Sequence, residues 1–365
     1  MGPRFRRKPL AAVFWCLAIV FASQVLFLLG TEGWQPRLGD PEYGGKLARL
    51  RARRAERPDA PMLVALGSSR VALGFRPALL RESSSSSPSE PLVFNLGIMR
   101  CHPVGELLYL RRLLADGVQP DGVLLEIYPP WLSLQAAEID NQADVARLRW
   151  PELRVLRAYA ACPDRLERYW LKTRLSPWAS YRFLLMNQMF PTWLDSGHRL
   201  DLNWRGLDDW GWVSVDHFAG HLDAEAHARA LSLIKEGCAG MTSLQTSDLV
   251  ERAYRSILDL CRERRIAVAL LLMPEGSTFR SWYSPASLQE IDRSVRTWAS
   301  EYGTSVIDAR LWCADSDFLE DVHLTHGGAV VFTRRLDLEG LPRLIAASRD
   351  SRIGRSQLVR RALRR

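Results

Sequence analysis

The sequence predicts an α/β protein in which a parallel five-stranded sheet is covered by helices on both faces and follows an N-terminal transmembrane helix. Two observations predict this class. Five short runs that are apolar throughout alternate with runs whose apolar residues recur at the helical period. An uncharged run of 21 residues lies near the N-terminus. With 365 residues, 47% of them apolar, the chain can bury one large core and carry an inserted region.

The uncharged run extends from Leu10 to Gly30 and follows a basic end at residues 1–9. At 1.5 Å per residue, a helix of this length measures about 31 Å, which matches the hydrocarbon core of a bilayer. A cleaved signal peptide has a shorter apolar region that ends in small residues, whereas bulky residues here continue almost to Gly30. We therefore expect an uncleaved, single-pass anchor in the cell membrane. The basic flank predicts a cytoplasmic N-terminus and a main domain on the periplasmic side.

The elements that follow show a strand–helix rhythm up to residue 130. Residues 31–59 are interpreted as a membrane-proximal linker with a helix near 42–55, and residues 60–130 as the first half of the sheet domain. This half contains a serine-rich loop at 81–90, a helix at 104–117, and strands within PMLVALGSSR (61–70), PLVFNLG (91–97) and GVLLEIYPP (122–130).

Residues 131–245 lose this rhythm and are interpreted as an insertion rich in tryptophan. They hold eight of the 13 tryptophans, and Trp204, Trp210 and Trp212 lie close together. Such side chains stack on sugar rings or pack in a small subdomain, and packing is the more common role. The histidines here, at 198, 217, 221 and 227, have no spacing that indicates a metal, and neither does His102, so we expect no metal and no cofactor.

The rhythm resumes over residues 246–345, which we interpret as the second half of the sheet domain. Helices are predicted at 247–265, 287–303 and 326–341, and strands at 266–274 and 304–310. The tail at 346–365 is rich in arginine and predicts either contact with polyanions or a solvated end. No zinc-finger spacing or RNA-binding signature accompanies the net charge of +8, so we expect no nucleic-acid partner.

The six cysteines give no motif. Cys16 lies in the expected membrane span, and the other five are widely scattered without a CxxC pair. Outside the cytoplasm one or two disulfides could form, and buried free thiols are an equal alternative.

Three turns follow strands at the edge where sites form in parallel sheets. They are Gly67-Ser68-Ser69-Arg70 after the first strand, Asn95-Leu96-Gly97 after the second, and Glu320 to His326 soon after the fifth. Each turn alone is typical of a structural role, because serine caps helices and a lone histidine usually packs or binds backbone.

Together the three turns resemble the SGNH/GDSL hydrolase family, over roughly residues 60–130 and 246–340. The resemblance implies a flavodoxin-like fold with a nucleophilic serine after the first strand, which is Ser69 here. It also implies a histidine just before the last helix, which is His323. The GSSR version of the first block is similar to that of membrane-anchored bacterial members that O-acylate envelope polymers.

The resemblance also assigns the remaining site residues. The usual Asp-x-x-His spacing favours Glu320 as the carboxylate that orients His323, and Asp321, which has the more usual side chain at the Asp-x-His spacing, stays open as the alternative. The oxyanion donors would be the backbone N–H groups of Ser69 and Gly97. His326 would be a structural helix-start residue.

The third block departs from the family, because Glu126-Ile127-Tyr128-Pro129-Pro130 stands where Gly-x-Asn is usual. The side-chain oxyanion donor is therefore unidentified, and Asn95 and Arg70 are the two candidates. Other architectures fit less well. The α/β-hydrolase elbow needs a second glycine that this chain lacks, and no GxGxxG follows the first strand.

The residues together predict a serine esterase or O-acyltransferase that works through an acyl-serine intermediate. The expected partners are the lipid bilayer and an acylated envelope glycan or polymer, with a membrane-bound acyltransferase as a further candidate. The alternative is a catalytically inactive SGNH-like anchor that binds glycan or serves as a scaffold in an envelope-modification complex. The missing asparagine favours this alternative, and the intact Ser69 and His323 oppose it.

Overall fold

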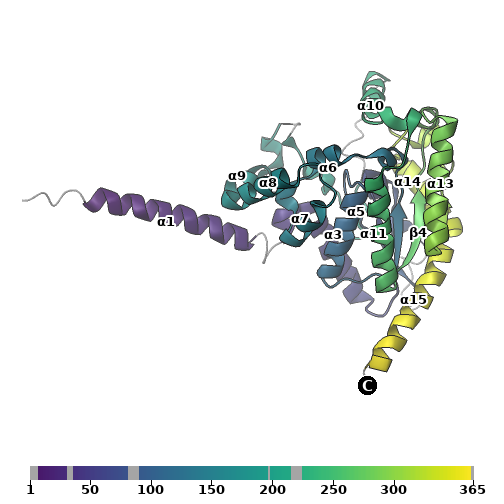
Figure 1. Ribbon diagram of the computed structural model, residues 1–365, viewed down its shortest axis with the longest axis horizontal. Helices are drawn as coiled ribbons and strands as arrows, with labels where there is room; N and C mark the ends of the chain where they lie inside the picture. The colour runs from purple at the N-terminus through teal and green to yellow at the C-terminus, as the bar shows by residue number, and fades with distance from the viewer. Residues whose placement is uncertain (1–6, 31–35, 81–89, 196–197, 215–223, 363–365) are drawn as a thin grey trace, which may run out of the picture. The chain divides into compact units, whose positions relative to one another are not determined.

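The computed structural model describes residues 7–30, 36–80, 90–195, 198–214 and 224–362 (Figure 1). The chain divides into two compact units. Unit 1 combines residues 1–44 with 140–201, and unit 2 combines residues 45–139 with 202–365. The serine-rich loop and the two histidines at 217 and 221 lie outside the described residues.

The described part of unit 2 contains one sheet of five parallel strands in the order β2-β1-β3-β4-β5. The strands are β1 (Met62–Leu66), β2 (Leu92–Asn95), β3 (Gly122–Glu126), β4 (Ala267–Leu272) and β5 (Ser305–Asp308). Strands β1, β2 and β3 are buried along their whole length, which explains their unbroken apolar sequences. The α/β class with a five-stranded parallel sheet is confirmed.

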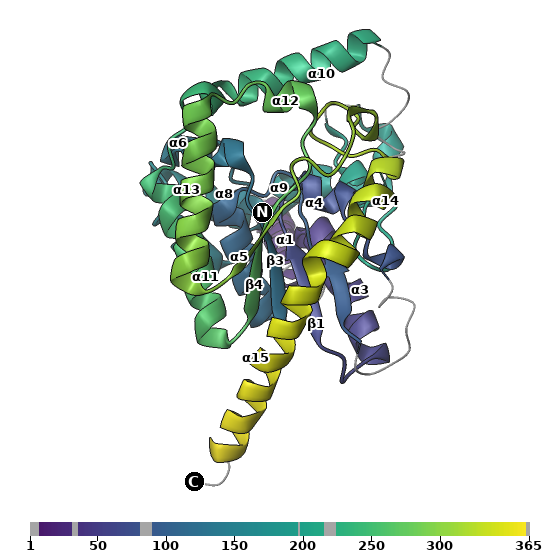
Figure 2. The ribbon, with the colours of Figure 1, turned by 90° about the vertical axis from the view of Figure 1, so that its right-hand side faces the viewer.

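Helices cover both faces of this sheet (Figure 2). On one face α15 packs on β3 and β4, and α14 packs on α4; on the other α11 packs on α5 and β4, and α13 packs on β5. The helices of this unit are α4 (Ser69–Gly74), α5 (Pro103–Ala115), α10 (Ala224–Gly237), α11 (Asp248–Arg264), α12 (Ser277–Arg280), α13 (Pro285–Tyr302), α14 (His326–Arg335) and α15 (Leu341–Ala362). Two others, α3 (Pro41–Glu56) and α6 (Ala136–Gln142), include residues of both units.

The helix ends follow from their capping residues. Ser247 begins α11 by accepting a hydrogen bond from Val250 N–H at 3.3 Å, and Ser284 begins α13 in the same way through Ser287 N–H at 3.1 Å. Gly303 ends α13 with a φ of 63°, in the left-handed region that glycine adopts without a steric cost.

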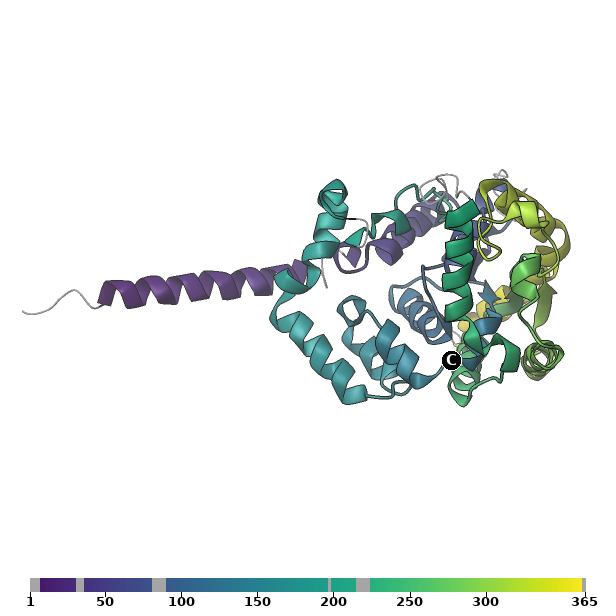
Figure 3. The same cartoon turned by 90° about the horizontal axis from the view of Figure 1, so that it is seen from above.

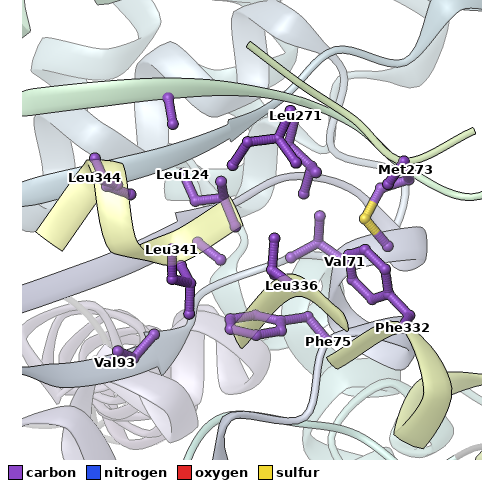
Figure 4. Close-up of a cluster of buried hydrophobic side chains, with 14 of the residues drawn as sticks. Val71, Phe75, Val93, Leu124, Leu271, Met273, Phe332, Leu336, Leu341 and Leu344 are labelled. Atoms are coloured by element: carbon purple, nitrogen blue, oxygen red, sulfur yellow. The ribbon is translucent and has the colours of Figure 1, made fainter. Parts of the chain in front are cut away.

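The core beneath α14 and α15 joins these helices to the sheet (Figure 4). Leu124 and Leu271 of the strands meet Phe332, Leu336 and Leu344 of the helical segment, and all five are at least 98% buried. Burial of each such side chain contributes about 1.5–3 kcal/mol to stability. A π-helical segment (Leu336–Gly340) joins α14 to α15, so the last helical region continues well past the predicted end at 341.

Unit 1 contains the N-terminal helix α1 (Arg7–Leu29) together with α2 (Pro36–Gly39), α7 (Trp150–Leu156), α8 (Pro163–Leu175) and α9 (Pro177–Met189). Leu10–Leu29 of α1 is long and apolar enough to cross a membrane. The C-terminal end of α1 contacts α9 (Figure 3).

The region from 131 to 245 does not behave as one insertion. Residues 140–201 belong to unit 1, whereas residues 202–245 belong to unit 2. The second part borders the sheet: Asn95 N–H donates to Trp210 C=O at 2.9 Å, and the buried Trp212 donates its indole N–H to Leu73 C=O at 2.6 Å. Trp212 is therefore a packing residue, and the domain division differs from the predicted one because these contacts join distant parts of the sequence.

Candidate active site

Ser69 lies at the sharp turn between β1 and α4. Ser68 is the N-cap of α4, and its Oγ accepts a hydrogen bond from Arg70 N–H at 3.1 Å. Ser69 is thus the first residue of the helix, and it is half-buried between two buried neighbours. The turn presents this hydroxyl at the carboxyl edge of the sheet.

The peptide groups before Ser69 are fixed from two neighbouring strands. Ile98 N–H, after β2, donates to Gly67 C=O at 2.9 Å, and Ser68 N–H donates to Glu126 Oε2, at the end of β3, at 2.6 Å. A Cβ on Gly67 would lie 2.6 Å from that same Glu126 oxygen, so the approach of the carboxylate requires glycine.

His323 lies in a tight turn before α14. Leu319 N–H donates to His323 C=O at 2.8 Å, and Phe318 and Leu324 form an antiparallel bridge beside it. Asp321, inside the turn, has a φ of 63°, a conformation that aspartate adopts more readily than most residues. His326 is the first residue of α14, in agreement with its expected structural position.

The structure brings Ser69, His323 and Glu320 together. Ser69 Oγ lies 2.8 Å from His323 Nε2, although 254 positions separate the two residues in sequence. On the other side of the imidazole ring, Nδ1 is hydrogen-bonded to Glu320 Oε1. The His323 side chain is 26% exposed and that of Glu320 is 9% exposed, so the imidazole is more accessible to solvent than the carboxylate bonded to it. Carboxylate, imidazole and hydroxyl are connected in the order that activates a serine nucleophile.

Asp321 points to a different partner. Its Oδ2 accepts a hydrogen bond from Phe279 N–H at 3.1 Å, and its backbone C=O accepts one from Gly276 N–H at 2.8 Å. These bonds hold the beginning of α12 against the histidine turn. Of the two adjacent carboxylates, Glu320 bonds to the imidazole and Asp321 anchors the loop after β4.

Asn95 is fully buried and uses its amide within the fold. Its Nδ2 donates to Val71 C=O at 2.8 Å and to Phe75 C=O at 2.5 Å, carbonyls at the end of α4. Its Oδ1 accepts the N–H of Gly97 at 2.9 Å. Both predicted donors, the Asn95 amide and the Gly97 N–H, are therefore occupied by partners inside the protein.

Gly97 has a packing reason for its identity, because a Cβ there would lie 2.5 Å from the backbone nitrogen of Ala72. The N–H of Ser69 has no acceptor among the described residues. Of the predicted oxyanion donors, Asn95 and Gly97 are bonded within the fold and Arg70 faces buried carbonyl and carboxylate groups, so the N–H of Ser69 is the one that stays available among the described residues. Each oxyanion donor lowers the activation barrier by about 3 kcal/mol, so a site with a single donor is expected to react slowly.

A buried charged cluster lies directly behind the nucleophile turn. Arg70 donates to Pro274 C=O at 2.6 Å and lies 3.8 Å from both Glu126 Oε1 and Glu275 Oε1, which is an ion-pair distance too long for a hydrogen bond. Its guanidinium also lies 4.7 Å from the ring centre of Tyr128. Arg70 is only 2% exposed, so its charge is directed into the protein.

Burial shifts the acid–base equilibria of this cluster. It raises the pKa of Glu275, although Arg70 opposes the shift. It also raises the pKa of Glu106, on α5, well above its usual value, and the neighbouring Glu126 adds to that effect. Sequence reasoning missed Glu275 and gave Glu126 no role, although the charge of Glu126 at the end of an otherwise apolar strand was a visible signal.

The described residues hold no group of three or more His, Cys, Asp or Glu side chains arranged to bind a metal, and all six cysteines are free thiols. No protein-family model matches the chain, and no similar protein was found among curated proteins. The function must therefore be inferred from the geometry of Ser69, His323 and Glu320 and from the residues that support them.

Proposed function

We propose that the protein is a membrane-anchored, extracytoplasmic serine esterase or O-acyltransferase of the SGNH type. The observation that carries the proposal is the hydrogen-bonded chain from Glu320 through His323 to Ser69. The strand order 2-1-3-4-5, which is that of flavodoxin-like sheets, and the position of Ser69 directly after β1 also support it.

The chemistry follows from the order of these groups. His323 Nε2 takes the proton of Ser69 Oγ as this oxygen attacks an ester carbonyl, and Glu320 stabilises the resulting imidazolium. The tetrahedral oxyanion accepts a hydrogen bond from Ser69 N–H. Collapse breaks the ester bond, His323 returns the proton to the departing alcohol, and the acyl group stays on Ser69. Attack by water then releases a free acid, whereas attack by a sugar hydroxyl completes a transfer.

The expected substrate is an acyl ester of an envelope glycan or polymer. Helix α1 supports an anchor, and its basic flank supports a domain on the periplasmic side. The similarity of the Gly67–Arg70 turn to envelope-acylating proteins supports transfer over hydrolysis. A membrane-bound acyltransferase would be the source of acyl groups in that case.

A second candidate function is a catalytically inactive anchor that binds glycan or serves as a scaffold. The specific observation in its favour is that the Asn95 amide and the Gly97 N–H are both bonded within the fold. This candidate would use the surface of the protein, and Ser69 would not react.

Labelling with a fluorophosphonate, which reacts with activated serines, tests the proposal. The full-length protein should be labelled, and Ser69→Ala and His323→Ala should abolish the label. Ser68→Ala is the matched control, because it removes a neighbouring hydroxyl whose role is to cap α4. Labelling that persists in Ser69→Ala would reject the assigned nucleophile. A folded wild-type protein without any label would support the inactive anchor.

A further inference from the structure

Unit 1 exposes a run of large apolar side chains between residues 171 and 193. A soluble protein exposes single residues of this kind, but a concentrated set indicates a contact surface. The set comprises Leu171 (46% exposed) and Leu175 (81%), one turn apart on α8, together with Trp178 (46%), Met189 (65%), Phe190 (42%) and Trp193 (73%). These residues belong to α8, to α9 and to the turn that follows α9. We call them the α8–α9 apolar surface.

This surface is continuous with the membrane helix. The rings of Phe27 in α1 and Trp178 in α9 lie 4.4 Å apart, and Gln24 Oε1 in α1 accepts a hydrogen bond from Trp178 N–H at 3.4 Å. Phe27 also lies 5.7 Å from the ring of Tyr181. The amide of Gln24, a polar side chain within an apolar run, thus meets one of the free N–H groups at the start of α9.

The contact fixes the depth of α9 along α1. Gln24 and Phe27 lie six and three residues before Gly30, where the apolar run ends. At 1.5 Å per residue, these positions are about 9 Å and about 4.5 Å inside that end. Helices that lie in the plane of a bilayer insert their apolar face by about 5–10 Å, so the first turn of α9 is at interfacial depth when α1 spans the membrane.

The charges around the surface match acidic headgroups. From Arg168 to Leu194 the chain carries four basic residues and no acidic one. Three of them, Arg168, Lys172 and Arg182, are exposed. Tryptophan and tyrosine also favour the boundary between headgroups and acyl chains, because their rings are apolar and their N–H or O–H groups are polar.

We propose that the α8–α9 apolar surface inserts into the bilayer interface next to the C-terminal end of α1, against a lipid surface with anionic headgroups. The protein would then bind the membrane through two elements, the spanning helix α1 and the interfacial pair α8 and α9. This inference depends on the anchoring part of the proposed function and is independent of the chemistry of Ser69.

Photocrosslinking in the full-length protein tests the inference. Benzoylphenylalanine replaces Leu175 or Trp193, and the protein is reconstituted in vesicles of phosphatidylethanolamine and phosphatidylglycerol. The same group at Leu17, in the middle of α1, tests the span, and at Arg296, an exposed residue of α13, it serves as the water-facing control. After irradiation, mass spectrometry should find phospholipid adducts at positions 17, 175 and 193 and none at 296.

The other outcomes distinguish a failure of the interfacial surface from a failure of the membrane anchor. Lipid adducts at Leu17 alone, or protein crosslinks in place of lipid at 175 and 193, would overturn the interfacial surface and leave the anchor in place. Absence of adducts at Leu17 would reject the anchor and with it this inference, without bearing on Ser69 labelling. Replacing phosphatidylglycerol by phosphatidylcholine should lower the yield at position 193 by at least about twofold, and an unchanged yield would overturn the preference for anionic lipid.

Discussion

Glu320 and Asp321 are adjacent in sequence but bond to different partners. Spacing favoured Glu320 as the partner of His323, and the side-chain type kept Asp321 open. The left-handed conformation of Asp321 decides between them, because it directs this carboxylate to Phe279 N–H while Glu320 bonds to His323 Nδ1. A backbone angle of this kind depends on the whole turn, which is why the sequence could not settle the choice.

Glu320→Gln should lower the rate of fluorophosphonate labelling by about 10²–10⁴-fold, because an amide does not stabilise the imidazolium and can orient the wrong tautomer. Asp321→Asn is the matched control. It should keep the rate within a few-fold, while weakening the attachment of α12. Labelling reactions of the two folded variants, stopped at successive times, give the two rates. The opposite ranking would assign the carboxylate role to Asp321.

Asn95 was a candidate oxyanion donor in the sequence, and the structure gives its amide a different set of partners. Asn95→Ala should lower the free energy of unfolding by about 2–4 kcal/mol, because buried carbonyls of α4 and the Gly97 N–H lose their partner. Labelling of Ser69 per folded molecule should change little. Urea unfolding and labelling of the same samples provide both values. Unchanged stability with loss of labelling would instead indicate a direct role in the reaction.

At the scale of elements, the turn that carries Ser69 depends on a charged cluster supplied by three strands. Arg70 follows β1, Glu126 ends β3 and Glu275 follows β4, so one guanidinium faces two buried carboxylates. Strand positions could be read from the sequence because the strands are apolar throughout. The pairing of these charges could not be predicted from the sequence, because it depends on the order of the strands in the sheet.

Arg70→Met should destabilise the protein by about 3–5 kcal/mol, because it leaves buried carboxylates without their cation. Adding Glu275→Gln to this variant should restore part of the loss, since it removes one of the uncompensated charges. The free energies of unfolding in urea, compared as a cycle, test this coupling. Additive effects of the two substitutions would show that Arg70 and Glu275 do not interact.

The buried Glu106 of α5 is expected to make the stability of the protein depend on pH. Its pKa is raised by burial above that of the unfolded chain, so its contribution to stability is full below about pH 4.5 and is lost as the pH rises towards the folded value. Glu106→Gln removes this loss. Each unit of the upward shift corresponds to about 1.4 kcal/mol that the variant should gain at pH 7.

Unfolding measured for both proteins at pH 4 and pH 7 tests this expectation. The free energy of unfolding of Glu106→Gln minus that of the wild type should be larger at pH 7 than at pH 4. A difference that does not change with pH would show that Glu106 titrates alike in the folded and unfolded chain.

Longer segments were predictable to different degrees. The strands lie within the runs that their apolar character indicated, and α5, α11 and α13 match their predicted ranges closely. The organisation of residues 131–245 could not be predicted from the sequence, because its parts belong to different compact units that join distant segments of the chain. The arginine-rich tail also continues as helix to Ala362, joined to α14 through a π-helical segment, a rare conformation in proteins.

At the scale of the whole molecule, parallel strands bring distant turns to one edge of the sheet. Ser69 and His323 are far apart in sequence, and β3 and β4 separate the strands that precede them; they meet because the histidine turn leads into α14, which packs on α4, the helix that begins at Ser69. The resemblance to SGNH proteins anticipated this meeting from the order of the blocks. It could not reveal that the Asn95 and Gly97 donors are already occupied.

The most direct test of the central claim is the detection of an acyl group on Ser69. The full-length protein is incubated with p-nitrophenyl acetate, quenched in acid and digested, and the peptide that contains Ser69 is analysed by mass spectrometry. The account predicts acetyl-Ser69 in the wild type and its absence in His323→Ala. Acetyl groups confined to other residues, or equal acetylation of Ser69 without His323, would contradict it.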